Sequence, residues 1–166
     1  SGGTEADNWA LRGAAHVFAS RGKHLIVSAV EHPAMIATAK ELQKEGFSVT
    51  FAGVDEYGAV DTAKLERAIR PDTTFVGVVT ANNEVGTILP VRVIAALCKS
   101  RGVAFFTDAV QAAGALPLNV GDMGVDMLSF SGHKFYGPKG VGVLYVRSGL
   151  RIGRIITGGH QERSMR

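Results

Sequence analysis

Apolar residues recur along the chain with two alternating periods, one typical of helices and the other of buried strands. Trp9, Leu11 and Phe18 follow the helical period in the first segment. Thr4, followed three residues later by Asp7, resembles a capping box and predicts the start of that helix. The same patterns predict helices over residues 4–20, 34–45, 61–70 and 91–101, a short helical turn over 108–113, and strands over 25–27, 49–51, 75–80, 103–107, 127–130 and 141–146.

This alternation of strands and helices predicts the fold class. Helices of about a dozen residues between strands imply right-handed crossovers and a mostly parallel sheet that is covered on both faces. We therefore expect an α/β fold with three layers. In such sheets ligands bind beyond the carboxyl ends of the strands, so polar residues that directly follow strands are the first candidates for chemistry.

Composition and charge exclude several classes of protein. Hydrophobic residues make up 46% of the 166 positions, which is enough for the core of one domain and excludes a disordered chain. The 18 basic residues are scattered among 15 acidic ones, so we expect no nucleic-acid partner. The longest stretch without a charge, residues 109–121, is shorter than the roughly 18 residues of a membrane span. The single cysteine, Cys98, allows no internal disulfide, and we expect a cytoplasmic protein.

One predicted strand end and one helix start carry chemistry that suits a charged aromatic ligand. Residues 1–4 place two glycines and two hydroxyls at a helix start, which attracts an anion, although an ordinary Thr4 cap has the same pattern. Asp108 and Gln111, three residues apart, would present a carboxylate to a protonated ring nitrogen and an amide to a ring oxygen. For Asp108 the alternative is a helix cap.

Three further strand ends complete the candidate set. Ser131, His133 and Lys134 emerge together after Gly132, and the Lys134 amine is a candidate nucleophile toward a carbonyl, although a solvated turn is the alternative. His32 suits stacking or proton transfer, or a structural role. The pair at residues 82–83 is compatible with a site or with an Asx turn. An anion site, an aspartate, a glutamine, a histidine and an amine together match pyridoxal 5′-phosphate, and no residue is predicted to bind a metal.

The motifs, taken in order, resemble a known family. They are residues 1–8 (SGGTEADN), Glu31-His32, residues 82–86 (NNEVG), residues 108–111 (DAVQ), residues 129–140 (SFSGHKFYGPKG) and residues 158–163 (GGHQER). This combination resembles the cysteine desulfurases of the NifS/IscS type. The resemblance covers the whole chain and implies the large domain of a fold-type I, class V aminotransferase, a pyridoxal-phosphate-dependent fold.

The resemblance implies a role for each matched residue. Lys134 would form the Schiff base with the cofactor and move protons at the substrate α-carbon, and His32 would stack on the ring and assist that transfer. Asp108 would pair with the ring nitrogen and keep it protonated. Gln111 would bond the ring oxygen, and Asn83 would lie near that oxygen and the substrate carboxylate. The phosphate would be held by Thr4, Ser131 and His133, and Gly3 is a further implied cofactor contact.

The resemblance also implies an activity and partners. The family converts L-cysteine to L-alanine and transfers the sulfur to an enzyme cysteine as a persulfide for iron–sulfur cluster assembly. Its members are homodimers that pass sulfur to a scaffold or acceptor protein. Another class V enzyme, such as a selenocysteine lyase or an aminotransferase, and a non-catalytic remnant that binds cofactor or a partner are the alternatives.

Several parts of the family pattern have no match within these residues. The persulfide cysteine, the arginine for the substrate carboxylate and the small domain are expected beyond Arg166, and an N-terminal segment is expected before Ser1. Residues 1–166 would then be a single large-domain fragment, inactive by itself. Cys98, next to Leu97 in a predicted helix, reads as a small buried hydrophobe rather than as the missing nucleophile.

Overall fold

The computed structural model describes residues 1–165 and shows six strands and six α-helices in alternation. The strands are β1 (His24–Ser28), β2 (Ser48–Ala52), β3 (Thr73–Gly77), β4 (Ala104–Asp108), β5 (Met127–Ser131) and β6 (Gly142–Val146). The helices are α1 (Gly3–Phe18), α2 (Pro33–Lys44), α3 (Thr62–Ala68), α4 (Val91–Ser100), α5 (Val120–Met123) and α6 (Gln161–Ser164), with a 3₁₀ helix, η1, at Gly132–Phe135.

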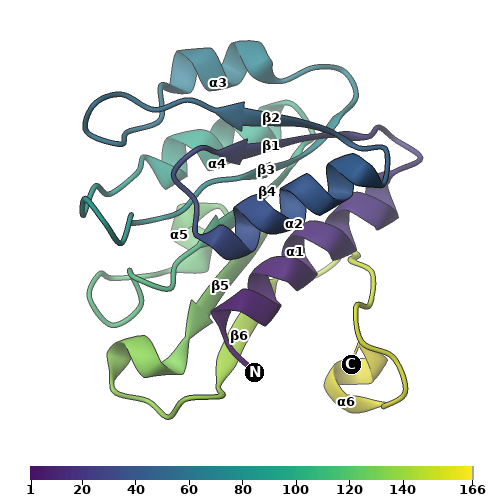
Figure 1. Cartoon of the computed structure of the whole chain (residues 1–166), viewed down its shortest axis with the longest axis vertical. Helices are drawn as coiled ribbons and strands as arrows, with labels where there is room; N and C mark the ends of the chain where they lie inside the picture. Colours follow the sequence, from purple (N-terminus) through teal and green to yellow (C-terminus); the bar gives the residue numbers. More distant parts are fainter. Residues whose placement is uncertain (166) are drawn as a thin grey trace.

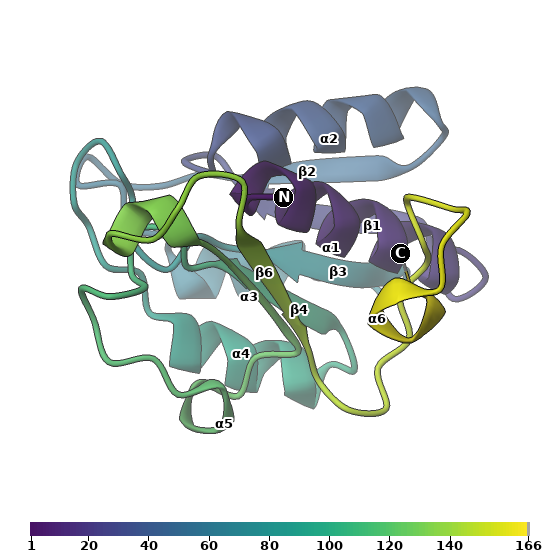
Figure 2. The same cartoon turned by 90° about the horizontal axis from the view of Figure 1, so that it is seen from below.

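The six strands form one sheet in the order β2-β1-β3-β4-β5-β6. The first five are parallel, and β6 returns antiparallel to β5. Helices α1 and α2 cover one face, while α3, α4 and α5 lie on the other, so the sheet is the middle of three layers (Figures 1 and 2). The expected α/β fold with a mostly parallel sheet is confirmed.

Each face of the sheet packs its own hydrophobic core. Under α1 and α2, the rings of Phe75 and Phe106 stack with their centroids 6.1 Å apart among buried leucine and alanine side chains. On the opposite face, Phe105 and Ile94 lie in the second core together with Cys98, which is fully buried. Burial raises the pKa of the Cys98 thiol to about 12, so this cysteine is an inert core residue, as the sequence predicted.

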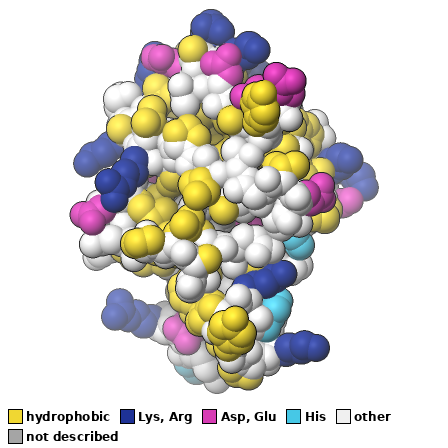
Figure 3. All heavy atoms as spheres, turned by 90° about the vertical axis from the view of Figure 1, so that its left-hand side faces the viewer, with side chains coloured by type: hydrophobic (Ala, Val, Ile, Leu, Met, Phe, Trp, Pro, Cys, Tyr) yellow, Lys and Arg dark blue, Asp and Glu magenta, His cyan; other side chains and the backbone are white. Residues whose placement is uncertain are grey.

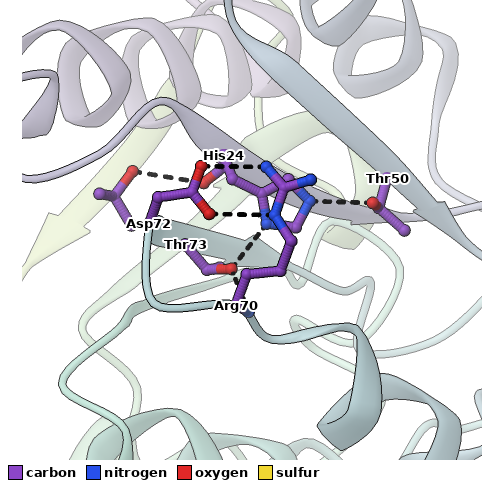
Figure 4. A network of polar contacts seen from close by, with 6 residues as sticks. His24, Thr50, Arg70, Asp72 and Thr73 are labelled. Carbon is purple, nitrogen blue, oxygen red and sulfur yellow. Dashed lines mark hydrogen bonds and ion pairs between the residues drawn. The ribbon is translucent and has the colours of Figure 1, made fainter.

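A polar network ties three strands together at the amino edge of the sheet, away from the expected site (Figure 4). His24 is fully buried, and its Nδ1 and Nε2 lie 2.6 Å from Thr73 Oγ1 and 2.9 Å from Thr50 Oγ1. Burial lowers the pKa of His24, with a smaller contribution from the nearby Arg70 guanidinium. The neutral imidazole therefore connects β1, β2 and β3 through side-chain hydrogen bonds.

Most predicted element boundaries agree with the structure to within a few residues, although helix α6 and the 3₁₀ helix η1 were not predicted. The short helical turn predicted over 108–113 forms as a single turn, in which the Ala112 and Ala113 N–H groups donate to the Ala109 carbonyl. Helix α5 was missed, although Asn119 caps it and Gly124 ends it in the left-handed conformation. The capping box is wrong: α1 begins at Gly3 after Gly2, and no side chain caps it.

Candidate functional site

All nine residues that the sequence singled out line one pocket of about 210 Å³ at the carboxyl ends of the parallel strands. They are Gly3, Thr4, His32, Asn83, Asp108, Gln111, Ser131, His133 and Lys134. A second hollow of about 340 Å³ adjoins it and shares Gly3, Thr4 and His133. The strand ends face the left-hand side of Figure 1, and Figure 3 looks onto that face, where histidine and basic side chains lie next to each other.

Glycines bring the start of α1 close to the sheet. A Cβ at Gly3 would lie 2.8 Å from Val110 Cγ2, and a Cβ at Gly142 would lie 2.5 Å from Gly2 Cα. The first backbone hydrogen bond of α1 is donated by Ala6 to the Gly2 carbonyl, so the N–H groups of the preceding turn are not used within the helix. The positive end of a 16-residue helix therefore opens into the two hollows.

Asp108 ends β4 and lies at the wall of the pocket, where it is only 3% exposed. Its Oδ1 accepts a hydrogen bond of 2.8 Å from the Val110 N–H, so it turns the chain after the strand without capping a helix. Burial raises the pKa of Asp108, while the Val110 N–H, His32 and Lys134 act in the opposite direction. A cation that reached Asp108 would further favour the charged carboxylate.

The end of β5 and the short helix that follows it present three polar side chains. Ser131 is the last residue of β5, and His133 and Lys134 lie on η1. The Ser131 hydroxyl and His133 Nδ1 are 2.9 Å apart, which orients the imidazole beside the start of α1. Tyr136 then turns the chain in the left-handed conformation with φ of 66°. Lys134 is exposed and therefore accessible to a ligand in the pocket.

Among His32, Asn82 and Asn83, some side chains stabilise a turn or helix start and some line the pocket. His32 is the N-cap of α2 and accepts a hydrogen bond of 3.1 Å from the Ala34 N–H through Nδ1, while its side chain also lines the pocket. Asn82 makes the Asx turn that the sequence allowed, with Oδ1 accepting from the N–H groups of Glu84 and Val85. Asn83 is the member of the pair that lines the pocket.

Two buried carboxyl groups next to the site were not recognised as part of it from the sequence. Asp7 lines the pocket and is 1% exposed, and its Oδ1 accepts a hydrogen bond of 2.6 Å from the Ser129 hydroxyl. Glu31 accepts hydrogen bonds from the Ser28 hydroxyl and the Val79 N–H through Oε1. Its Oε2 is buried and has no hydrogen-bond partner among residues 1–165.

Burial determines the protonation of both groups. It raises the pKa of Asp7 to about 8, with a further contribution from the charge of Asp108. It also raises the pKa of Glu31 to about 8, against the opposing hydrogen bonds from Ser28 and Val79. One signal for Asp7 was available in the sequence, because its spacing of three from Thr4 places both residues on the same side of the helix.

Comparison with known proteins assigns the family. The model of the class V aminotransferases matches residues 1–164. The chain belongs to the aminotransferase class V family. It is 51% identical over 166 residues to the cysteine desulfurase IscS of Clostridium botulinum (strain Kyoto / Type A2), covering all of this chain and 42% of that protein. It is 48% identical to the IscS of Methanosarcina thermophila, of which it covers 41%.

Solved structures of class V relatives share the fold. A NifS-like protein superposes with a TM-score of 0.96 at 41% identity, over 99% of this chain and 46% of that one. A structure described as SspA in complex with cysteine superposes with a TM-score of 0.94 at 38% identity, over 99% of this chain and 48% of that one. The chain thus spans less than half the length of these relatives. Among residues 1–165, no helix has the length and apolar character to cross a membrane.

Proposed function

We propose that the pocket binds pyridoxal 5′-phosphate and that the whole protein is a cysteine desulfurase. The observation that carries this proposal is the convergence of all nine predicted residues on one pocket. The available donors and acceptors fit each end of the cofactor. The uncapped start of α1 offers N–H groups to a phosphate, and Asp108 offers a carboxylate to a protonated ring nitrogen.

The proposed contacts follow from where each side chain lies. Gly3, Thr4, Ser131 and His133 are the phosphate-binding residues, because they surround the positive end of α1. Asp108 binds the ring nitrogen, Gln111 and Asn83 bind the ring oxygen, and His32 stacks on the ring. Lys134, the exposed amine at the mouth of the pocket, is the residue that reacts with the cofactor aldehyde.

When bound, pyridoxal 5′-phosphate supplies an aldehyde for an amine and a ring that withdraws electrons from the substrate α-carbon. The chain supplies the groups that direct this chemistry. Asp108 keeps the ring nitrogen protonated, and its low exposure strengthens that ion pair because water does not screen it. The Lys134 amine and the His32 imidazole are the groups proposed to hold or move the proton of the substrate α-carbon.

The substrate, the product and the partners are proposed for the whole protein. The names of the IscS relatives and the cysteine in the SspA structure support L-cysteine as the substrate, and we propose L-alanine as the product. The persulfide cysteine would come from a part of the protein outside these 166 residues, since Cys98 is buried in the core. We also propose that residues 1–166 are one cofactor-binding domain, that the whole protein is a cytoplasmic homodimer, and that it passes sulfur to an acceptor for iron–sulfur clusters.

An absorbance titration tests the cofactor assignment. Pyridoxal 5′-phosphate added to the purified chain should produce the saturable visible band of a lysine adduct. Lys134→Ala should abolish this band, whereas Lys99→Ala, which removes a lysine on α4, should leave it intact. A band that persists in Lys134→Ala, or that is lost equally in both variants, would overturn the assignment.

A further inference from the structure

The carboxyl group of Asp7 lies at the same pocket as Asp108 but reaches it from a different layer of the fold. Asp7 belongs to α1, which covers the sheet, and Asp108 ends β4 within the sheet. The two are connected through Ser129 on β5, which is the register partner of Asp108 and donates its hydroxyl hydrogen to Asp7 Oδ1 at 2.6 Å. The close approach of Gly3 to Val110 brings this part of α1 against the loop that Asp108 begins.

Two carboxyl groups oppose ionisation of Asp7, while His32, His133 and Lys134 line the same pocket. Asp108 is the last residue of β4, and Glu31 lies after β1. The negative charge of each opposes ionisation of Asp7. His32 and Lys134 favour the charged form of Asp108. Burial and this charge pattern hold the pKa of Asp7 at about 8, so at neutral pH Asp7 keeps its proton while Asp108 is the carboxyl that the nearby cations favour as an anion.

We propose that Asp7 is a positioning residue for the ring-nitrogen end of the site, which holds one exchangeable proton beside Asp108 and releases it when a cationic ring binds there. This inference rests on the proposed cofactor site. A neutral Asp7 avoids two adjacent carboxylates in the empty pocket. When the ring cation arrives, it offsets the second negative charge, and the Asp7 proton passes to solvent through the pocket that Asp7 lines.

Linkage turns this proton release into a measurable pH dependence. A ligand that lowers the pKa of Asp7 binds more tightly as the pH rises toward the pKa of the free protein, and the gain ends above about pH 8. Asp7→Asn keeps an oxygen that can accept from Ser129 but carries no proton to release. Protonation of the cofactor itself contributes equally to both proteins, so it cancels in the ratio of their dissociation constants.

The experiment measures the dissociation constant of pyridoxal 5′-phosphate for the chain and for Asp7→Asn at intervals from pH 6 to 9. We expect the ratio of the Asp7→Asn constant to the wild-type constant to rise with pH, by up to about tenfold per unit, and to level off above pH 8. Ser129→Ala removes a hydrogen bond that lowers the pKa of Asp7, so in this background the ratio of dissociation constants should level off at a higher pH. Asp122→Asn, at an exposed position on α5, should give a ratio that does not change with pH.

A second measurement separates failure of this inference from failure of the cofactor site. Without cofactor, a protonated Asp7 makes the free energy of unfolding decrease as the pH rises from about 4 to about 8. Asp7→Asn should make this decrease with pH less steep. Tight cofactor binding with a flat ratio would overturn the inference and leave the proposed function standing. Absence of any cofactor binding would overturn the proposed function. If the free energy of unfolding of Asp7→Asn depended on pH as steeply as that of wild type, Asp7 would not be protonated in the folded protein, and the inference would fail for that reason alone.

Discussion

Replacement of Glu31 by glutamine provides a quantitative test of the buried carboxyl cluster. Glu31 Oε1 accepts from Ser28 and Val79, and Oε2 is buried without a partner among the described residues. A glutamine keeps the accepting oxygen and places a neutral amide at the position of Oε2. If Glu31 is protonated in the folded protein, the substitution should change the pH dependence of stability more than stability itself.

The magnitude follows from the two protonation states. Glu31 has a pKa of about 8 when folded and an ordinary value of 4.5, so near neutral pH the folded state binds about one more proton than the unfolded state. Because its folded pKa is raised, its contribution to stability is complete below pH 4.5 and is lost as the pH rises through 8. Between pH 5.5 and 7.5 this loss is on the order of 2–3 kcal/mol.

Urea unfolding at pH 5.5, 6.5 and 7.5 measures the difference directly. The free energy of unfolding of wild type should fall relative to Glu31→Gln by on the order of 2–3 kcal/mol across this range. Glu56→Gln, in an exposed loop, should run parallel to wild type. Parallel lines for wild type and Glu31→Gln would show that Glu31 is ionised in the folded protein and would refute the argument from burial.

Three further predictions concern the sheet edge, the start of α1 and a helix cap. Because burial lowers the pKa of His24, the stability that depends on its neutral form should be lost as the pH falls below 6.5. In urea unfolding, the free energy of unfolding of His24→Gln should decrease less than that of wild type over this acidic range. Gly142→Ala should weaken binding of pyridoxal 5′-phosphate at least tenfold, because its Cβ would lie 2.5 Å from Gly2 Cα and displace the start of α1; unchanged affinity would contradict the close approach. Asp61→Ala should lower the free energy of unfolding by about 1 kcal/mol, since Asp61 Oδ1 caps two N–H groups of α3, while Asp61→Asn should recover most of that loss.

The sequence predicted the fold class and the residues of the pocket because both depend on local pattern. Parallel strands bring their carboxyl ends to one edge, so residues after separate strands, such as His32, Asp108 and Lys134, were expected to meet, and they do. Their chemical roles stay predictions. The sequence could not reveal that Glu31 has an unpartnered oxygen, because that depends on how closely β3 approaches it.

The start of α1 shows why local patterns fail where tertiary contacts compete. Thr4 and Asp7 have the spacing of a capping box, and the same spacing also turns both side chains toward the sheet. The hydrogen bond from Ser129, which is 122 positions away in sequence, fixes Asp7 in the second arrangement. The helical turn predicted after Asp108 does form, because its hydrogen bonds are local: Asp108 accepts from the Val110 N–H, and the Ala113 N–H donates to the Ala109 carbonyl.

The most direct test of the cofactor site is to identify the lysine that reacts with pyridoxal 5′-phosphate. The chain would be mixed with the cofactor, reduced with borohydride and digested, and the modified peptide would be identified by mass spectrometry. We expect one principal adduct, at Lys134, at the mouth of the pocket that Asp108 lines. Modification mainly at Lys139, or spread over the exposed lysines, would contradict the proposed site.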